Sequence, residues 1–207
     1  MELLKRIKLI AIIFIVTIVS LNLNAQTAVI NAFSKSYELE KKGEYKKAVT
    51  ELKNVYDANS YEINLRLGWL NYQAGVFTES VAHYQKAINL MPYSEEAKFG
   101  LIYPKTAVGK WGEVISLYKK ILANSPNNTT ANYRLGLIYY GQKDYSKAYT
   151  YFKKVVNLYP FGYDGLLMLA WTNFQQGKMR EAKVLFNKVL MYTPGDKSAL
   201  EGLDLIK

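Results

Sequence analysis

Aromatic side chains recur through this 207-residue sequence at intervals of 34 residues, and the chemistry that they offer is binding. They fill two of three corresponding places in each interval. These residues are Trp69 and Tyr72 beside Leu65, then Phe99 and Tyr103, then Tyr133 and Tyr140, and then Trp171 and Phe174. Large rings give extensive contact at a low cost in conformational entropy, so the pattern favours a surface that binds another molecule.

Catalytic chemistry has few candidate residues in this chain. The sequence contains 0 cysteines, which excludes disulfides, thiol nucleophiles and cysteine-based metal sites. His83 is the only histidine, and we expect it to be solvated or partly packed rather than a general base. The sequence has no glycine-rich phosphate loop, paired metal ligands or nucleophile motif. We therefore expect no catalytic residue, no metal site and no cofactor.

The elements that would position the aromatic residues follow from four prolines. Pro92, Pro126, Pro160 and Pro194 are each 34 residues apart and each follows an apolar run. Within those runs apolar residues recur three or four residues apart, as on one face of a helix. A proline ends a helix because it lacks an N–H and restricts the residue before it. Glycine seventeen residues before three of the prolines can close a preceding helix, so each interval predicts a helix, a tight turn and a second helix.

These segments resemble the tetratricopeptide repeat family. The resemblance rests on "LRLGWLNYQAGVFTESVAHYQKAINLMP", "YRLGLIYYGQKDYSKAYTYFKKVVNLYP" and "LMLAWTNFQQGKMREAKVLFNKVLMYTP", with two looser copies beside them. It implies an all-α fold, an α-solenoid of about five helix-turn-helix repeats that forms a right-handed superhelix. It also implies that the first helices line a concave groove for a peptide or for a helix of a partner.

The repeat boundaries predict the organisation of the chain. We expect five units over residues 29–196, at 29–60, 61–94, 95–128, 129–162 and 163–196, with a C-terminal capping helix at 197–207. Terminal repeats need such a cover for their apolar face. The third unit departs from the pattern because Pro104 lies inside its first helix, where we expect a kink or an early end.

A helical-wheel argument separates the groove side of each first helix from the side that faces its second helix. The aromatic places fall on the groove side, and the first unit adds Phe33 and Tyr37. The candidate partner-binding residues are Phe33, Tyr37, Leu65, Trp69, Tyr72, Phe99, Tyr103, Tyr133, Tyr140, Trp171 and Phe174. The alternative is that these rings only pack neighbouring first helices together.

A second stripe of the same period consists of lysines on the second helices. They are Lys86, Lys120, Lys154 and Lys188, with Lys53, Lys119 and Lys153 beside them. A row of lysines could lie against anionic lipid headgroups or an acidic partner. A merely solvated face is the alternative.

The N-terminus predicts export. Lys5, Arg6 and Lys8 precede an apolar run that is followed by "SLNLNAQ", which is the layout of a secretory signal, and cleavage after Ala25 would fit it. The alternative is a retained membrane anchor, although the run is short of the ~20 residues that span a bilayer. Export disfavours nucleic acid as a partner despite the net charge of +10.

Together these features predict a non-enzymatic, exported scaffold that is periplasmic or associated with the cell envelope. It would bind a protein or peptide through the concave aromatic face and organise an envelope complex. The alternative is a module that attaches to a membrane surface or envelope polymer through the lysines or the N-terminal anchor. The sequence leaves the oligomeric state and the partner open.

Overall fold

The computed structural model describes residues 26–206, which form helices joined by short turns and include no strand. The all-α prediction is therefore confirmed for this part of the chain. The proposed signal segment, residues 1–25, lies outside the described residues. No helix within 26–206 has the length and apolar character that crossing a membrane requires. The chain divides into two compact units, and the boundary in the sequence falls between Gly109 and Lys110.

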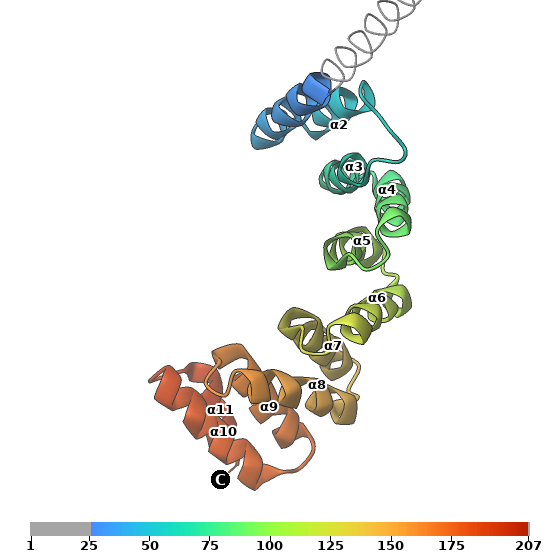
Figure 1. The fold of residues 1–207 in the computed structure, drawn as a ribbon. Coiled ribbons are helices and arrows are strands. Elements are labelled where there is room, and N and C mark those ends of the chain that lie inside the picture. Colours follow the sequence, from blue (N-terminus) through green and yellow to red (C-terminus); the bar gives the residue numbers. More distant parts are fainter. Residues whose placement is uncertain (1–25, 207) are drawn as a thin grey trace, which may run out of the picture. The chain divides into compact units, whose positions relative to one another are not determined.

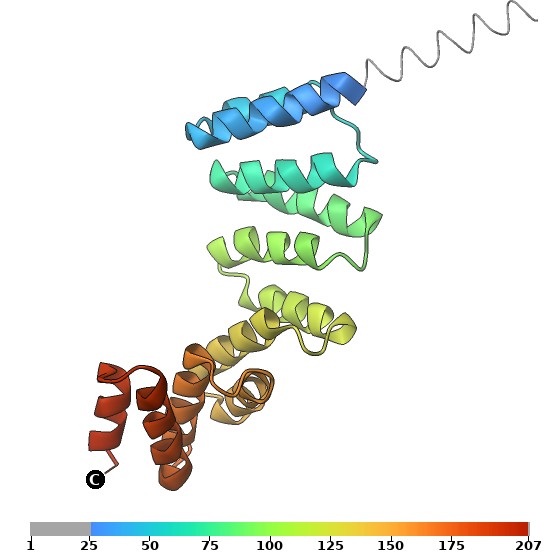
Figure 2. The same cartoon turned by 60° about the vertical axis from the view of Figure 1, so that its left-hand side comes forward.

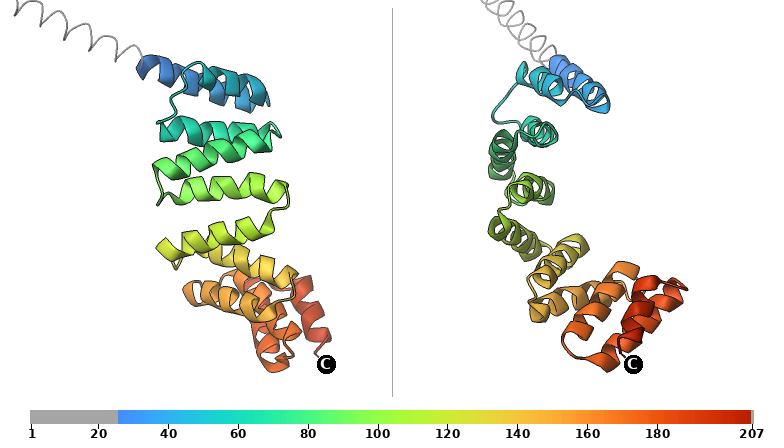
Figure 3. Two further views of the ribbon diagram at one scale, coloured as in Figure 1. Left: turned by 90° about the vertical axis from the view of Figure 1, so that its right-hand side faces the viewer. Right: turned by 180° about the vertical axis from the view of Figure 1, so that it is seen from behind.

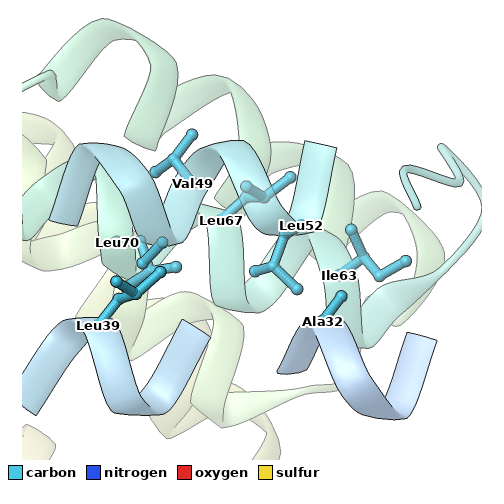
Figure 4. Packing of buried hydrophobic residues seen from close by; sticks show 8 residues of the cluster. Ala32, Leu39, Val49, Leu52, Ile63, Leu67 and Leu70 are labelled. Carbon is cyan, nitrogen blue, oxygen red and sulfur yellow. The ribbon is translucent and has the colours of Figure 1, made fainter. Parts of the chain in front are cut away.

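Unit 1 contains residues 26–41 as a first helix, followed by α2 (Tyr45–Lys53), α3 (Tyr61–Gln73), α4 (Phe77–Leu90) and α5 (Glu95–Ala107) (Figure 1). Successive helices of this unit lie one above another (Figure 2). Aliphatic side chains from the first helix, α2 and α3 gather between these helices (Figure 4). That core consists of Ala32, Leu39, Ala48, Val49, Leu52, Ile63, Leu67 and Leu70.

Unit 2 contains α6 (Trp111–Asn124), α7 (Thr129–Gly141), α8 (Tyr145–Leu158), α9 (Tyr163–Gln175), α10 (Met179–Tyr192) and α11 (Lys197–Asp204). In this unit α10 packs against both α9 and α11 (Figure 3). The core between these three helices is formed by Leu166, Ala170, Ala182, Phe186, Val189 and Ala199.

Helix ends follow from local sequence signals. Gly75, Gly109 and Gly177 have φ of 75°, 71° and 74°, which confirms the left-handed turns predicted from their spacing. Lys143 stands at the corresponding place with φ of 60°. Asn128, in the "NNTT" segment, accepts a hydrogen bond from the Ala131 N–H at 2.9 Å and so caps the start of α7.

Pro104 does not end its helix early, so that part of the expectation was wrong. The helix α5 runs for 13 residues and has the same length as α3. Pro104 lies in the last turn, and its own carbonyl still accepts a hydrogen bond from the Val108 N–H at 3.2 Å. Only one helical turn follows the missing N–H, which limits the backbone bonds that the proline can disturb.

Aromatic rings on second helices lie directly on the backbone of first helices. A Cβ atom added at Gly68 of α3 would lie 2.8 Å from the Tyr84 ring, and one added at Gly136 of α7 would lie 2.6 Å from the Phe152 ring. Gly100 of α5 has the same relation to the opposite part of the Tyr84 ring. Glycine therefore sets how closely these helices approach.

A second recurring contact joins three of the first helices, α3, α5 and α7, to the loops before them. The Asn64 side-chain amide donates to the carbonyls of Ala58 and Ser60, and the Asn132 amide donates to those of Pro126 and Asn128. Midway between them in sequence, the ammonium group of Lys98 donates to the carbonyls of Pro92 and Ser94. All three side chains are buried.

The glycine contacts predict a specific cost of substitution. We expect Gly136→Ala to lower the free energy of unfolding by about 1–3 kcal/mol, because the new methyl group overlaps the Phe152 ring. Gly141→Ala is the control, because nothing lies within 4 Å of the added Cβ in the same helix. Alanine there should be neutral or stabilise by up to about 1 kcal/mol through helix propensity. Urea denaturation measures both variants, and equal effects would contradict this packing argument.

Candidate functional site

Unit 1 contains a groove with a volume of about 740 Å³, which we call the unit 1 groove. Its walls come from the first helix, α3 and α5, and its lining also includes Tyr84 and Met91 from the α4 region. The predicted binding residues that line it are Phe33, Tyr37, Leu65, Trp69, Phe99 and Tyr103. The groove thus brings together candidates from three successive first helices of the repeat.

At its aromatic end Trp69 and Tyr103 line the groove, and Tyr72, which does not line it, packs against both rings. The Tyr72 ring centroid lies 5.8 Å from that of Trp69 and 5.4 Å from that of Tyr103, and the Trp69 and Tyr103 centroids are 6.0 Å apart. Trp69 and Tyr72 are half-buried, whereas Tyr103 is 49% exposed. The rings therefore pack against one another and still present apolar surface to a ligand.

One buried ion pair fixes the side of the groove next to the first helix. Arg66 Nη2 lies 2.6 Å from Glu40 Oε2, and Arg66 Nε donates to Ser36 Oγ at 3.2 Å. The guanidinium carbon lies 3.7 Å from the centroid of the Tyr37 ring. Glu40 also accepts from the Trp69 indole N–H at 2.5 Å. Arg66 is only 8% exposed, so its charge is matched by Glu40 beneath the groove surface.

The other end of the groove, where α3 and α5 begin, is polar and acidic. The Tyr61 hydroxyl lies 2.8 Å from Ser94 Oγ and donates to Glu96 Oε2 at 3.3 Å. Ser60 Oγ donates to Glu62 Oε2 at 3.1 Å. Burial is the main cause that raises the pKa of Tyr61, and the nearby carboxylates add to it, so the phenol remains a donor at neutral pH.

The remaining candidates lie in unit 2 and share more of their surface with its interior. The Trp171 ring centroid lies 5.0 Å from that of Phe186 and 5.6 Å from that of Phe174, and its N–H donates to Ser198 Oγ at 2.9 Å. Tyr133 contacts Phe152, and Tyr140 contacts Tyr145. Burial raises the pKa of both Tyr133 and Tyr140. All four candidates are half-buried, so packing between helices uses part of each ring.

Three family models, each described as Tetratricopeptide repeat, match residues 33–95, 129–161 and 164–190. The chain belongs to the tetratricopeptide repeat family. No curated protein matches its sequence at a significant level.

Solved structures share the tetratricopeptide solenoid fold. A tetratricopeptide repeat protein from Parabacteroides merdae is 21% identical with a TM-score of 0.73, and the match covers 87% of this chain and 72% of that one. A MamA structure is 22% identical with a TM-score of 0.69 over 80% of this chain and 91% of its own. MamA from Desulfovibrio magneticus is 20% identical with a TM-score of 0.68, covering 82% and 97%. At these identities the likeness concerns the fold.

Sequence reasoning missed the polar members of the groove. Glu62 and Glu96 stand 34 residues apart and lie seven residues before Trp69 and Tyr103. Seven residues are two helical turns, so extending the helical wheel toward the helix start would have placed both on the groove side. Met91 gave no such signal, because it follows the end of a second helix.

His83 has a structural role in this tetratricopeptide chain and is more buried than we expected, with 8% exposed. Its Nδ1 lies 3.1 Å from Asn64 Oδ1. Because the Asn64 amide nitrogen donates to two carbonyls, Oδ1 is the acceptor and Nδ1 carries the proton. Within residues 26–206 no group of three or more histidine or acidic side chains could hold a metal ion.

The burial of His83 predicts a pH dependence of stability. Burial is the largest cause that lowers its pKa below the ordinary 6.5, Lys86 and Lys53 lower it further, and Glu79 opposes them. The unfolded chain therefore binds a proton more readily than the folded chain, so stability is complete above about pH 6.5 and falls below it.

We expect His83→Gln to lose less stability than the parent when the pH falls from about 7.5 to about 5. The urea midpoint at the two pH values measures this difference, and carboxylates that titrate in both proteins cancel in the comparison. An equal loss in parent and variant would show that His83 does not contribute.

Proposed function

We propose that this tetratricopeptide chain is a non-enzymatic scaffold that binds an apolar segment of a partner protein in the unit 1 groove. Tetratricopeptide repeats are protein-interaction modules, and this part rests on membership of the family. The observation that carries the choice of site is the meeting of aromatic residues from three successive first helices around one groove.

The exposure and the fixed positions of the aromatic residues in the groove support binding of a ligand rather than packing between helices alone. Two of its aromatic residues, Tyr37 and Tyr103, are 50% and 49% exposed although each contacts a groove neighbour. Arg66 and Glu40 hold Tyr37 and Trp69 in place before any ligand arrives. A site that is already ordered loses little conformational entropy on binding, which favours affinity.

The proposed setting is the cell envelope, and it is supported by the sequence of residues 1–25. Lys5, Arg6 and Lys8 before an apolar run favour export, with a retained N-terminal anchor as the alternative. In either case we propose that the repeats organise an envelope-associated complex.

A second candidate function is attachment to an anionic membrane surface or envelope polymer. It is favoured by the exposure of six of the periodic lysines, which are Lys53 and Lys86 in unit 1 and Lys119, Lys120, Lys153 and Lys154 in unit 2, whereas Lys188 is half-buried. Lysine side chains at a surface attract anionic headgroups, and salt weakens this attraction.

Replacing the exposed groove tyrosines should strongly weaken partner binding. We expect the variant with Tyr37→Ala and Tyr103→Ala to retain at least tenfold less of the specific partner than the parent in quantitative affinity capture from the envelope fraction, because central aromatic residues carry most interface energy. Tyr93→Ala is the matched control, since Tyr93 is 81% exposed and does not line the groove.

The same capture separates the two candidate functions. A partner retained equally by the parent, the control and the groove variant would contradict the proposed site. Partner binding that the groove variant retains and that is lost at about 0.5 M salt, where exposed charges are screened, would favour the lysines instead.

Export is tested separately by N-terminal sequencing of the protein from fractionated cells. We expect a mature protein in the envelope or periplasmic fraction that begins at Gln26, because small and polar residues precede this position. An intact Met1 in a protein that remains in the membrane fraction would support the anchor. Intact protein in the cytoplasm would contradict export.

A further inference from the structure

We infer that the unit 1 groove selects partner segments that combine apolar side chains with lysine or arginine, and that the basic group lies where α3 and α5 begin. This inference rests on the proposed function, because it names the class of segment that the same groove would bind. It follows from how charge is distributed among the groove residues.

The single cation among the lining residues is already matched. Arg66 pairs with Glu40 at 2.6 Å and lies under the Tyr37 ring. It is 8% exposed, so it offers no free positive charge to an acidic ligand. An acidic peptide would therefore gain little from this arginine.

The carboxylates of Glu62 and Glu96 remain available. Both side chains are at the groove, and neither has an ion-pair partner among residues 26–206. Their hydrogen-bond partners are the hydroxyl groups of Ser60 and Tyr61, which orient a carboxylate without neutralising it. The groove thus has two unmatched negative charges in a chain whose net charge is +10.

The arrangement gives the groove a direction. Glu62 and Glu96 stand in the first turns of α3 and α5, and Trp69 and Tyr103 stand seven residues further along the same helices. At a rise of ~1.5 Å per residue, the acidic end lies about 10 Å from the aromatic end along α3. A bound segment would place its basic group and its main apolar side chain about that far apart.

Acidic residues in a first helical turn also stabilise the helix itself. Glu79 has this position in α4, within the same unit, but does not line the groove. It therefore provides the matched control, because Glu79→Gln removes the same charge from the same kind of helix position without touching the groove.

The test is selection of binders from a phage-displayed library of random 12-residue peptides, with the full chain as target. For the parent and Glu79→Gln, we expect selected peptides rich in aromatic and aliphatic residues, with lysine and arginine in clear excess over aspartate and glutamate. For the variant with Glu62→Gln and Glu96→Gln, the apolar preference should persist and the excess of basic residues should disappear. A selected peptide should bind about two- to fivefold more weakly for each carboxylate removed, as for an exposed ion pair.

Two outcomes overturn the inference, and they are distinguishable. Selection of neutral or acidic peptides, or an unchanged basic excess in the double glutamine variant, overturns the charge preference while the groove remains a binding site. Selection that Tyr37→Ala and Tyr103→Ala leave unchanged overturns the proposed function as well, because the peptides would then bind elsewhere.

Discussion

Contacts between aromatic rings and glycine backbones fix the spacing of the helices, and the groove depends on that spacing. Tyr84 of α4 lies against Gly68 of α3 and against Gly100 of α5, so one ring separates two successive first helices. Phe186 lies in the same way against Gly202 of α11. A methyl group at any of these glycines would overlap the ring. Close packing of this kind fixes helix spacing because cores at near-crystalline density have no room to adjust.

The spacing fixed by Tyr84 produces the groove. Because α3 and α5 both pack against the Tyr84 ring, Trp69 and Tyr103 come close together, with 6.0 Å between their ring centroids. The ion pair of Arg66 and Glu40 then sets the position of the first helix against α3. The surface with exposed aromatic residues is thus a consequence of interior contacts, and a substitution at Gly68 or Gly100 would disturb it without touching its lining.

Periodicity alone predicted most of this arrangement, because every first helix repeats the same packing problem. The prolines located the helix ends, and the glycines located the left-handed turns. Contacts that break the period could not be predicted in this way. His83 is buried because Asn64 offers it an acceptor, and Pro104 is accommodated because so little of α5 follows it. The acidic end was not predicted because the helical-wheel argument began one turn after Glu62 and Glu96. Met91 was not predicted because it reaches the groove from a neighbouring loop.

The contact between a first helix and its preceding loop recurs in α3, α5 and α7 with two kinds of donor. An asparagine amide makes this tie at Asn64 and Asn132, and a lysine ammonium makes it at Lys98. Residues 96–128 are also the stretch that separates the first two matches to the family models. Two chemically different donors, an amide and an ammonium group, thus bind equivalent pairs of loop carbonyls. The start of a first helix can therefore keep its local hydrogen bonds inside a stretch that the family models do not match.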